Sequence, residues 1–183
     1  MTTSITEKST TFEFDDSWAV LKYDQHPHYR KHLSKIEGTK AVDLVGVQNR
    51  NSLFLIEIKD FRHYPIPGER RDNLPTDVAA KARDTIAGLV GACHMSGDSC
   101  FKVNIAPVLL SNRVRPRIVF LLIERPPTTS YQAKRYKTRR NILLTELKSR
   151  CRWLTTRVHL VDLSECESCI SGLTINNRLE SSA

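Results

Sequence analysis

Two apolar runs separated by a short polar stretch constrain this chain more than any other feature. The first run covers residues 41–47, the second covers residues 53–58, and the residues between them read QNRNS. Asparagine and serine are common turn residues, and apolar runs on both sides of such a stretch predict a β-hairpin. We therefore expect residues 40–60 to form a pair of largely buried antiparallel strands.

The predicted hairpin carries three charged residues within its apolar runs. Asp43 lies in the first run, and Glu57 and Lys59 lie at the end of the second. Side chains two apart on a strand share one face, so Glu57 and Lys59 project together while Ile56 and Ile58 point the other way. A turn near residue 49 brings Asp43 alongside them. Charges in buried strands are costly unless they are paired or bind a metal.

Two carboxylates beside a lysine have a specific chemical capability. Asp43 and Glu57 offer hard oxygen ligands suited to Mg²⁺ or Mn²⁺, which also accept phosphate oxygens from a substrate. Lys59 can orient or deprotonate a water molecule and stabilise charge that develops on the phosphate. The alternative is an ion pair between Glu57 and Lys59 on an edge strand, with Asp43 in a turn.

The hairpin resembles the PD-(D/E)xK nuclease superfamily, whose fold is called restriction-endonuclease-like. Asp43 matches the lone aspartate of the motif, Glu57-Ile58-Lys59 matches (D/E)xK, and thirteen residues lie between Asp43 and Glu57. Val42 stands where the motif has proline. The resemblance implies that Asp43, Glu57 and the backbone carbonyl of Ile58 bind the metal, and that Asp43, Glu57 and Lys59 are catalytic.

The resemblance implies two further residues of the site. The superfamily often has a third acidic metal ligand, for which Glu37, Asp24 and Glu13 compete, and Asp24 is preferred. A helix lysine near the site also recurs, and Lys81 is the candidate. A solvated surface lysine is the alternative for Lys81.

Length and composition set the broad class of the protein. With 183 residues, 40% hydrophobic and 26% charged, the chain suits one soluble domain over residues 1–183, with frayed ends at 1–10 and 171–183. No apolar run is long enough to cross a membrane, and the start of the chain lacks the layout of a secretory signal. Five cysteines without a second CxxC pair suggest reduced thiols. We expect a cytoplasmic protein with no membrane contact.

The remaining pattern predicts an α/β fold. We expect strands within residues 11–23 with a turn at 15–17, and a short basic helix over 26–38. After the hairpin come a loop over 61–75 and a helix capped by Thr76, whose apolar stripe is Val78, Ala82, Ile86, Leu89 and Cys93. Residues 99–110 are ambiguous between a strand and a loop. A buried strand over 117–124, a basic helix over 131–151 and a strand over 157–163 follow, with Tyr136, Leu143, Leu147 and Cys151 facing inward.

This order resembles a restriction-endonuclease-like mixed β-sheet flanked by helices. The core is of the αβββαβ type, with an extra N-terminal strand region and a C-terminal helix and strand. The superfamily places a helix ahead of its first strand, whereas strand-like sequence precedes the only helix before this hairpin. The resemblance therefore covers the chain from residue 40 onward.

The net charge of +8 favours a polyanionic partner. The residues expected to bind nucleic acid lie in the loop after the hairpin and in the basic helix: Arg62, Arg70, Arg71, Lys134, Arg139 and Arg140. We expect a Mg²⁺- or Mn²⁺-dependent nuclease acting on DNA, and a homodimer is one possible assembly. The resemblance is compatible with roles in prokaryotic defence, mobile elements and repair. The alternatives are a non-catalytic nucleic-acid-binding module on the same fold and a basic interaction protein.

Overall fold

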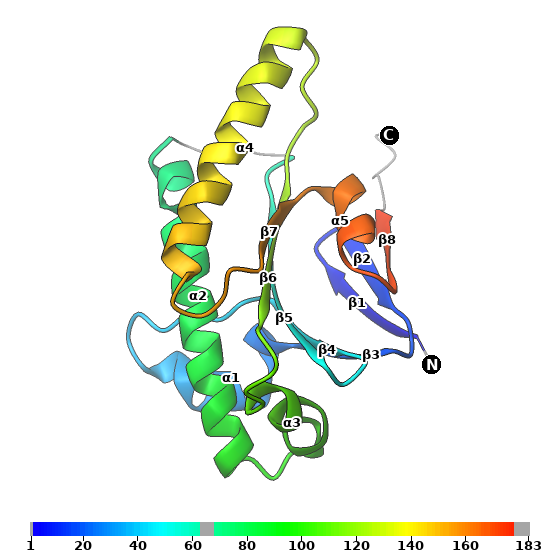
Figure 1. The fold of residues 1–183 in the computed structure, drawn as a ribbon, viewed down its shortest axis with the longest axis vertical. Coiled ribbons are helices and arrows are strands. Elements are labelled where there is room, and N and C mark those ends of the chain that lie inside the picture. The colour runs from blue at the N-terminus through cyan, green and yellow to red at the C-terminus, as the bar shows by residue number, and fades with distance from the viewer. Residues whose placement is uncertain (1, 63–67, 178–183) are drawn as a thin grey trace.

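The protein is a mixed α/β structure in which helices and a second, smaller sheet cover the two faces of a central sheet (Figure 1). The computed structural model describes the backbone of residues 2–62 and 68–177, and the side chains of these residues apart from 68–71 and 177. The expected mixed β-sheet flanked by helices is confirmed.

The central sheet has five strands in the order β3-β4-β5-β6-β7. β4 runs antiparallel to both of its neighbours, β3 and β5, and β6 and β7 run parallel to β5. Their bounds are Trp18–Lys22, Leu44–Gln48, Ser52–Asp60, Arg117–Ile123 and Val158–Val161. The strands expected over 117–124 and 157–163 are thus β6 and β7. As the apolar sequence of β6 indicated, it is buried on both faces in the parallel part of the sheet.

The predicted hairpin is formed by β4 and β5. Leu44 pairs with Ile56 and Gln48 pairs with Ser52, so the turn falls at residues 49–51 as expected. Asn49 and Arg50 both have positive φ, at 49° and 55°, a conformation that asparagine adopts more readily than most residues.

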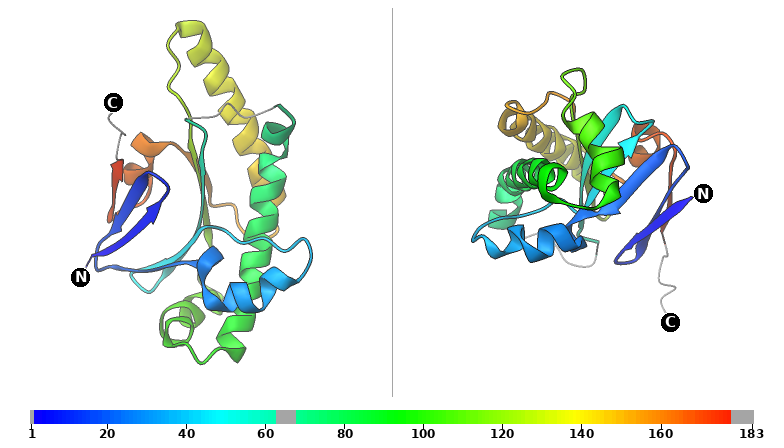
Figure 2. Two further views of the ribbon diagram at one scale, coloured as in Figure 1. Left: turned by 180° about the vertical axis from the view of Figure 1, so that it is seen from behind. Right: turned by 90° about the horizontal axis from the view of Figure 1, so that it is seen from below.

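Two long helices cover one face of the sheet (Figures 1 and 2). They are α2, over Gly68–Met95, and α4, over Ser130–Cys151. The expected stripe of α2 is buried at Val78, Ala82 and Leu89, and Ile86 and Cys93 pack partly buried against the same core. On α4, Leu143, Leu147 and Cys151 are buried as expected, and Tyr136 is half-buried. This core fixes α2 above the hairpin.

The opposite face carries a three-stranded antiparallel sheet of order β1-β2-β8. Its strands are Thr3–Glu7, Thr10–Phe14 and Leu173–Asn177, and α5, over Leu163–Cys169, precedes β8. The expectation of frayed ends at 1–10 and 171–183 is therefore wrong for β1 and β8. Phe12, Phe14 and Leu173 are buried in a second core, and this burial holds β2 and β8 on the central sheet.

The expectations for two short segments were also inaccurate. The basic helix over 26–38 is divided into α1, over Pro27–Lys31, and a 3-10 turn η2, over Leu33–Lys35, with another such turn, η1, at Tyr23–Gln25 before them. Residues 99–110 are helical, forming the π-helical turn η3, over Cys100–Ile105, and α3, over Ala106–Leu109. Local propensity alone did not distinguish these short segments.

The start of α2 differs most from its prediction. The sequence indicated a loop to residue 75 and a cap at Thr76, but the helix runs through Pro75 from residue 68. Proline removes one helical hydrogen bond, which normally ends or bends a helix. Leu74 and Val78 are both buried, and burial of two side chains on one helical face offsets that loss.

No helix in the ranges that the structure describes has the length and apolar character needed to span a membrane. The five cysteines are all free thiols.

Gly46 tests how tightly the hairpin packs. A Cβ atom at this position would lie 2.8 Å from Cζ3 of Trp18, a buried ring that also contacts Phe54 with ring centroids 4.7 Å apart. We expect Gly46→Ala to lower the free energy of unfolding by about 1–3 kcal/mol, because a packed ring has little room to move. Urea unfolding measures the change.

Gly91→Ala is the matched control. A Cβ atom there meets nothing within 4 Å, and the residue lies inside α2. Alanine in a helix interior is favoured over glycine by about 0.5–1 kcal/mol, so this variant should be more stable than wild type. Equal destabilisation by both substitutions would contradict the packing argument.

Candidate active site

Four charged side chains from three elements converge on the face of the sheet covered by α2. Asp43 immediately precedes β4, Glu57 and Lys59 lie on β5, and Lys81 lies on α2. Lys81 contacts both carboxylates, and Lys59 contacts Glu57. The hairpin and the helix thus bring together the three residues expected to be catalytic and the one expected to support them.

Glu57 is the centre of this charge cluster. Its side chain is fully buried, and Lys81 Nζ donates to both of its oxygens, at 2.7 Å from Oε1 and 2.9 Å from Oε2. Lys59 Nζ lies 2.6 Å from Oε1. Burial and the nearby Asp43 raise the pKa of Glu57, while the two ammonium groups oppose that rise. A buried carboxylate here depends on the two lysines.

The two lysines keep partial contact with solvent. The side chain of Lys59 is 31% exposed and that of Lys81 is 17% exposed. Burial acts to lower the pKa of Lys59, but the adjacent carboxylate of Glu57 outweighs burial and the pKa lies above its ordinary value. Lys59 is therefore a cation that donates hydrogen bonds. Its side chain lies near the end of β5 and is partly exposed to solvent.

Asp43 is hydrogen-bonded to β5, the strand that bears Glu57. Its Oδ2 accepts a hydrogen bond of 2.6 Å from the backbone N–H of Ile58, and its Oδ1 lies 3.8 Å from Lys81 Nζ. Its own carbonyl accepts from the N–H of Tyr23 at 2.9 Å. These bonds fix the carboxylate at the junction of β4, β5 and η1.

Contacts with α2 position the segment ahead of Asp43. The buried hydroxyl of Thr85 accepts from the N–H of Val42 at 3.0 Å, and Asp84 accepts from the N–H of Lys40 at 3.0 Å. Sequence reasoning assigned no role to Thr85. A threonine next to an otherwise apolar helix stripe was the available signal.

Asp24 is the candidate third acid that the structure places near the cluster. It lies in η1, and its Oδ1 is buried without a hydrogen-bond partner among the described residues. Burial, and then repulsion from Asp43, raise the pKa of Asp24. The two competing candidates lie elsewhere, because Glu37 is exposed and Glu13 is on β2 of the small sheet.

The oxygen donors suit a hard divalent cation in their chemistry. Asp43, Asp24 and Glu57 supply carboxylates, and the unpartnered oxygen of Asp24 is the observation that most favours a missing cation. Across residues 2–62 and 68–177, however, no group of three or more acidic, histidine or cysteine side chains is already arranged around a metal position. Binding of a cation by Glu57 must compete with its two ammonium partners.

Three of the arginines expected to contact nucleic acid, Arg62, Arg139 and Arg140, are paired with acids of the protein itself. Arg62 Nη2 lies 2.6 Å from Oδ2 of Asp60 and also donates to Ser9. Arg139 Nη2 lies 2.7 Å from both oxygens of Glu124.

Arg140, whose side chain is 11% exposed, pairs with Glu165 at 2.8 Å and donates to the carbonyl of Leu160. Lys134 is exposed on α4. Arg70 and Arg71 lie in the first turn of α2, and their side chains are outside the described part of the structure.

Comparison with known proteins gives little independent information. The chain is 30% identical over 119 residues to the cysteine–tRNA ligase of Neisseria meningitidis serogroup A / serotype 4A, a match that covers 49% of this chain and 17% of that protein. The chain thus spans about a sixth of the length of this relative, and a match of this extent assigns no activity. No family model matches the chain, and no solved structure matches it.

The raised pKa of Asp24 predicts a pH-dependent effect of Asp24→Asn. The folded state keeps the Asp24 proton at pH values where the unfolded chain has lost it, so the free energy of unfolding falls as pH rises from about 3.9 through the folded pKa. The Asp24→Asn variant has no carboxyl group at this position, so its free energy of unfolding does not fall for this reason. Its stability relative to wild type should increase over that window and stay constant above it, as measured by urea unfolding in EDTA.

Asp15→Asn supplies a control of opposite sign. Hydrogen bonds from the side chain and backbone of Ser17 lower the pKa of Asp15, so its ionised form stabilises the fold above the unfolded pKa. This variant should lose stability relative to wild type as pH rises from the lowered folded pKa of Asp15 to about 3.9, which lies below the window of Asp24. An Asp24→Asn variant that is less stable than wild type at neutral pH would contradict the conclusion that the folded structure disfavours the ionised form of Asp24.

Proposed function

We propose that the protein is a divalent-metal-dependent nuclease that hydrolyses phosphodiester bonds, on a restriction-endonuclease-like fold. One observation carries the proposal: a fully buried glutamate, an aspartate bonded to the neighbouring backbone and two lysines meet where β5 ends. The matching order of β4, β5, α2 and β6, with β6 parallel to β5, supports it. Such a cluster costs folding free energy and is hard to account for by stability alone.

Asp43, Glu57, the carbonyl of Ile58 and Asp24 would hold Mg²⁺ or Mn²⁺ in this proposal. The metal would supply positive charge to the phosphate and a more acidic bound water. Lys59 lies beside Glu57 and is partly exposed, so it can orient the attacking water and donate to the phosphate oxygens. Lys81 donates to both oxygens of Glu57 and opposes the rise in the pKa of this carboxyl that burial and Asp43 cause.

A non-catalytic nucleic-acid-binding module is the second candidate. The observation that favours it is the completeness of the Glu57 pairing, since two ammonium groups already satisfy this carboxylate. In that case the cluster would be a buried ion network, and added metal would leave the protein unchanged.

DNA is the first substrate to test, and RNA is the second. The name of the relative from Neisseria meningitidis makes tRNA its substrate, which is a reason to include an RNA arm. A cytoplasmic location and a homodimer remain part of the proposal as further expectations.

Activity of the site should depend on all three motif residues. We expect Asp43→Asn, Glu57→Gln and Lys59→Ala each to reduce cleavage of plasmid, single-stranded DNA or RNA in Mg²⁺ or Mn²⁺ by about a hundredfold or more. The losses should be non-additive, because the residues act as one unit. Asp77→Asn is the matched control, since Asp77 forms a surface pair with Lys40 and its side chain is 45% exposed.

Metal binding should also stabilise the fold. A cation that binds only the folded state raises the melting temperature, and the rise grows with the ratio of its concentration to its Kd. Millimolar Mn²⁺ should therefore raise the melting temperature of wild type and of Asp77→Asn, and should leave that of Asp43→Asn nearly unchanged. Equal shifts in all three proteins, or none in wild type, would favour the binding module instead.

A further inference from the structure

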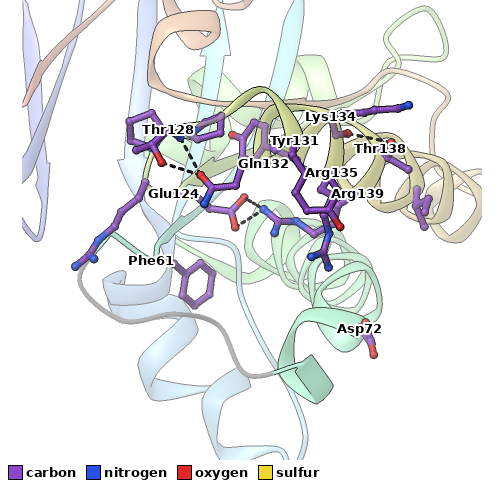
Figure 3. Close-up of a pocket in the computed structure, with 15 residues that line it drawn as sticks. Phe61, Asp72, Glu124, Thr128, Tyr131, Gln132, Lys134, Arg135, Thr138 and Arg139 are labelled. Carbon is purple, nitrogen blue, oxygen red and sulfur yellow. Dashed lines mark hydrogen bonds and ion pairs between the residues drawn. The ribbon is translucent and has the colours of Figure 1, made fainter.

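A groove separate from the charge cluster lies between α4 and the segment that follows β6. Its volume is about 1120 Å³, and it is walled by residues 124–128 on one side and by the first half of α4 on the other. Figure 3 shows Arg135 and Arg139 extending from α4 over this space, with Phe61 on the facing side. Figure 1 shows that the first half of α4, which walls the groove, projects beyond the sheet.

The groove combines aromatic and basic side chains. Tyr131 is 68% exposed, and the guanidinium of Arg135 lies 5.8 Å from its ring centroid. The guanidinium groups of Arg139 and Arg140 each lie 5.4 Å from the ring centroid of Tyr136. A guanidinium within about 6 Å of a tyrosine ring centroid is attracted to the face of that ring.

The charge of the groove is positive overall. Its basic side chains are Arg125, Lys134, Arg135 and Arg139, and its acidic side chains are Asp72 and Glu124. Glu124 is already paired with Arg139. Within residues 2–62 and 72–177, neither Lys134 nor Arg135 forms an ion pair with an acid, so both are placed to meet phosphates.

The groove begins next to the proposed active site. In the parallel pair of β5 and β6, Lys59 is opposite Leu122 and Asp60 is opposite Ile123. The N–H of Phe61 donates to the carbonyl of Ile123 at 2.8 Å, so Phe61 and Glu124 continue the two strands. Phe61, which lines the groove, is therefore two residues beyond Lys59.

We infer that this groove binds a single-stranded polynucleotide segment. Unpaired bases would stack on Tyr131 and Phe61, and the phosphates between them would contact Lys134 and Arg135. Aromatic platforms interleaved with cations suit unpaired strands, because every unpaired base offers a π-face while a duplex keeps its base faces stacked inside. Binding of a single strand in the groove does not require nuclease activity. The inference rests on the proposed function only where it directs the bound strand toward Lys59 as a catalytic residue.

Binding in EDTA tests the inference without requiring cleavage. Fluorescence anisotropy of labelled oligo(dT) and of a hairpin duplex of equal charge measures both affinities on the full chain. We expect the single strand to bind at least about tenfold more tightly than the duplex. Tyr131→Ala should weaken single-strand binding about tenfold by removing one stacking surface, and Tyr131→Phe should keep most of the affinity.

Trp153→Ala is the matched control. Trp153 follows α4, is 59% exposed and does not line the groove, so its loss should leave the affinity unchanged. Lys134→Gln and Arg135→Gln should each reduce the salt dependence of single-strand binding by about 0.7 in the logarithmic slope. Labelled oligo(U) in parallel shows whether the strand is DNA or RNA.

Two results would overturn the inference: duplex binding as tight as single-strand binding, or a Tyr131→Ala variant as tight as wild type. Failure of the nuclease proposal is distinguishable, because Glu57→Gln leaves the groove intact. Single-strand binding that persists in Glu57→Gln, together with no metal-dependent cleavage by wild type, would uphold the groove and reject the nuclease.

Discussion

The burial of Glu57, in contact with two lysines, is the constraint on which the rest of the site depends. A carboxylate at zero exposure on an otherwise apolar strand is tolerable only with cations in contact, and Lys59 and Lys81 provide them from a strand and a helix. Because Lys81 belongs to α2, the pairing also fixes where that helix crosses the hairpin. The charge cluster and the packing of the core are therefore one arrangement.

The scaffold around this pairing explains why Asp43 is held so firmly. Thr85 and Asp84 of α2 bind the backbone at Val42 and Lys40, and the N–H of Ile58 binds Asp43 itself. Each bond joins the segment ahead of β4 to an element that also bears a lysine or glutamate of the cluster. The position of the Asp43 carboxylate is thus set by hydrogen bonds between side-chain oxygens and backbone N–H groups of neighbouring elements.

The sequence predicted the site better than it predicted the ends of the chain. Period-two spacing and the turn at residue 49 were enough to bring Asp43, Glu57 and Lys59 together, because hairpin register is local. The strand at Leu173–Asn177 could not be found this way, since its partner Thr10–Phe14 is over 150 residues distant and its own sequence is polar. The start of α2 was missed for a related reason: Pro75 reads as a helix breaker until the burial of its neighbours is known. The internal pairing of Arg139 and Arg140 likewise depends on acids of other elements.

The central claim is that this cluster exchanges a lysine contact for a divalent cation. Anomalous diffraction from crystals soaked in Mn²⁺ tests it most directly. The account predicts an anomalous peak within bonding distance of Asp43 and Glu57, with the Lys81 ammonium withdrawn from at least one oxygen of Glu57. A map with no peak there, and with both lysines still in contact with Glu57, would contradict it and leave an ion network that serves the fold alone.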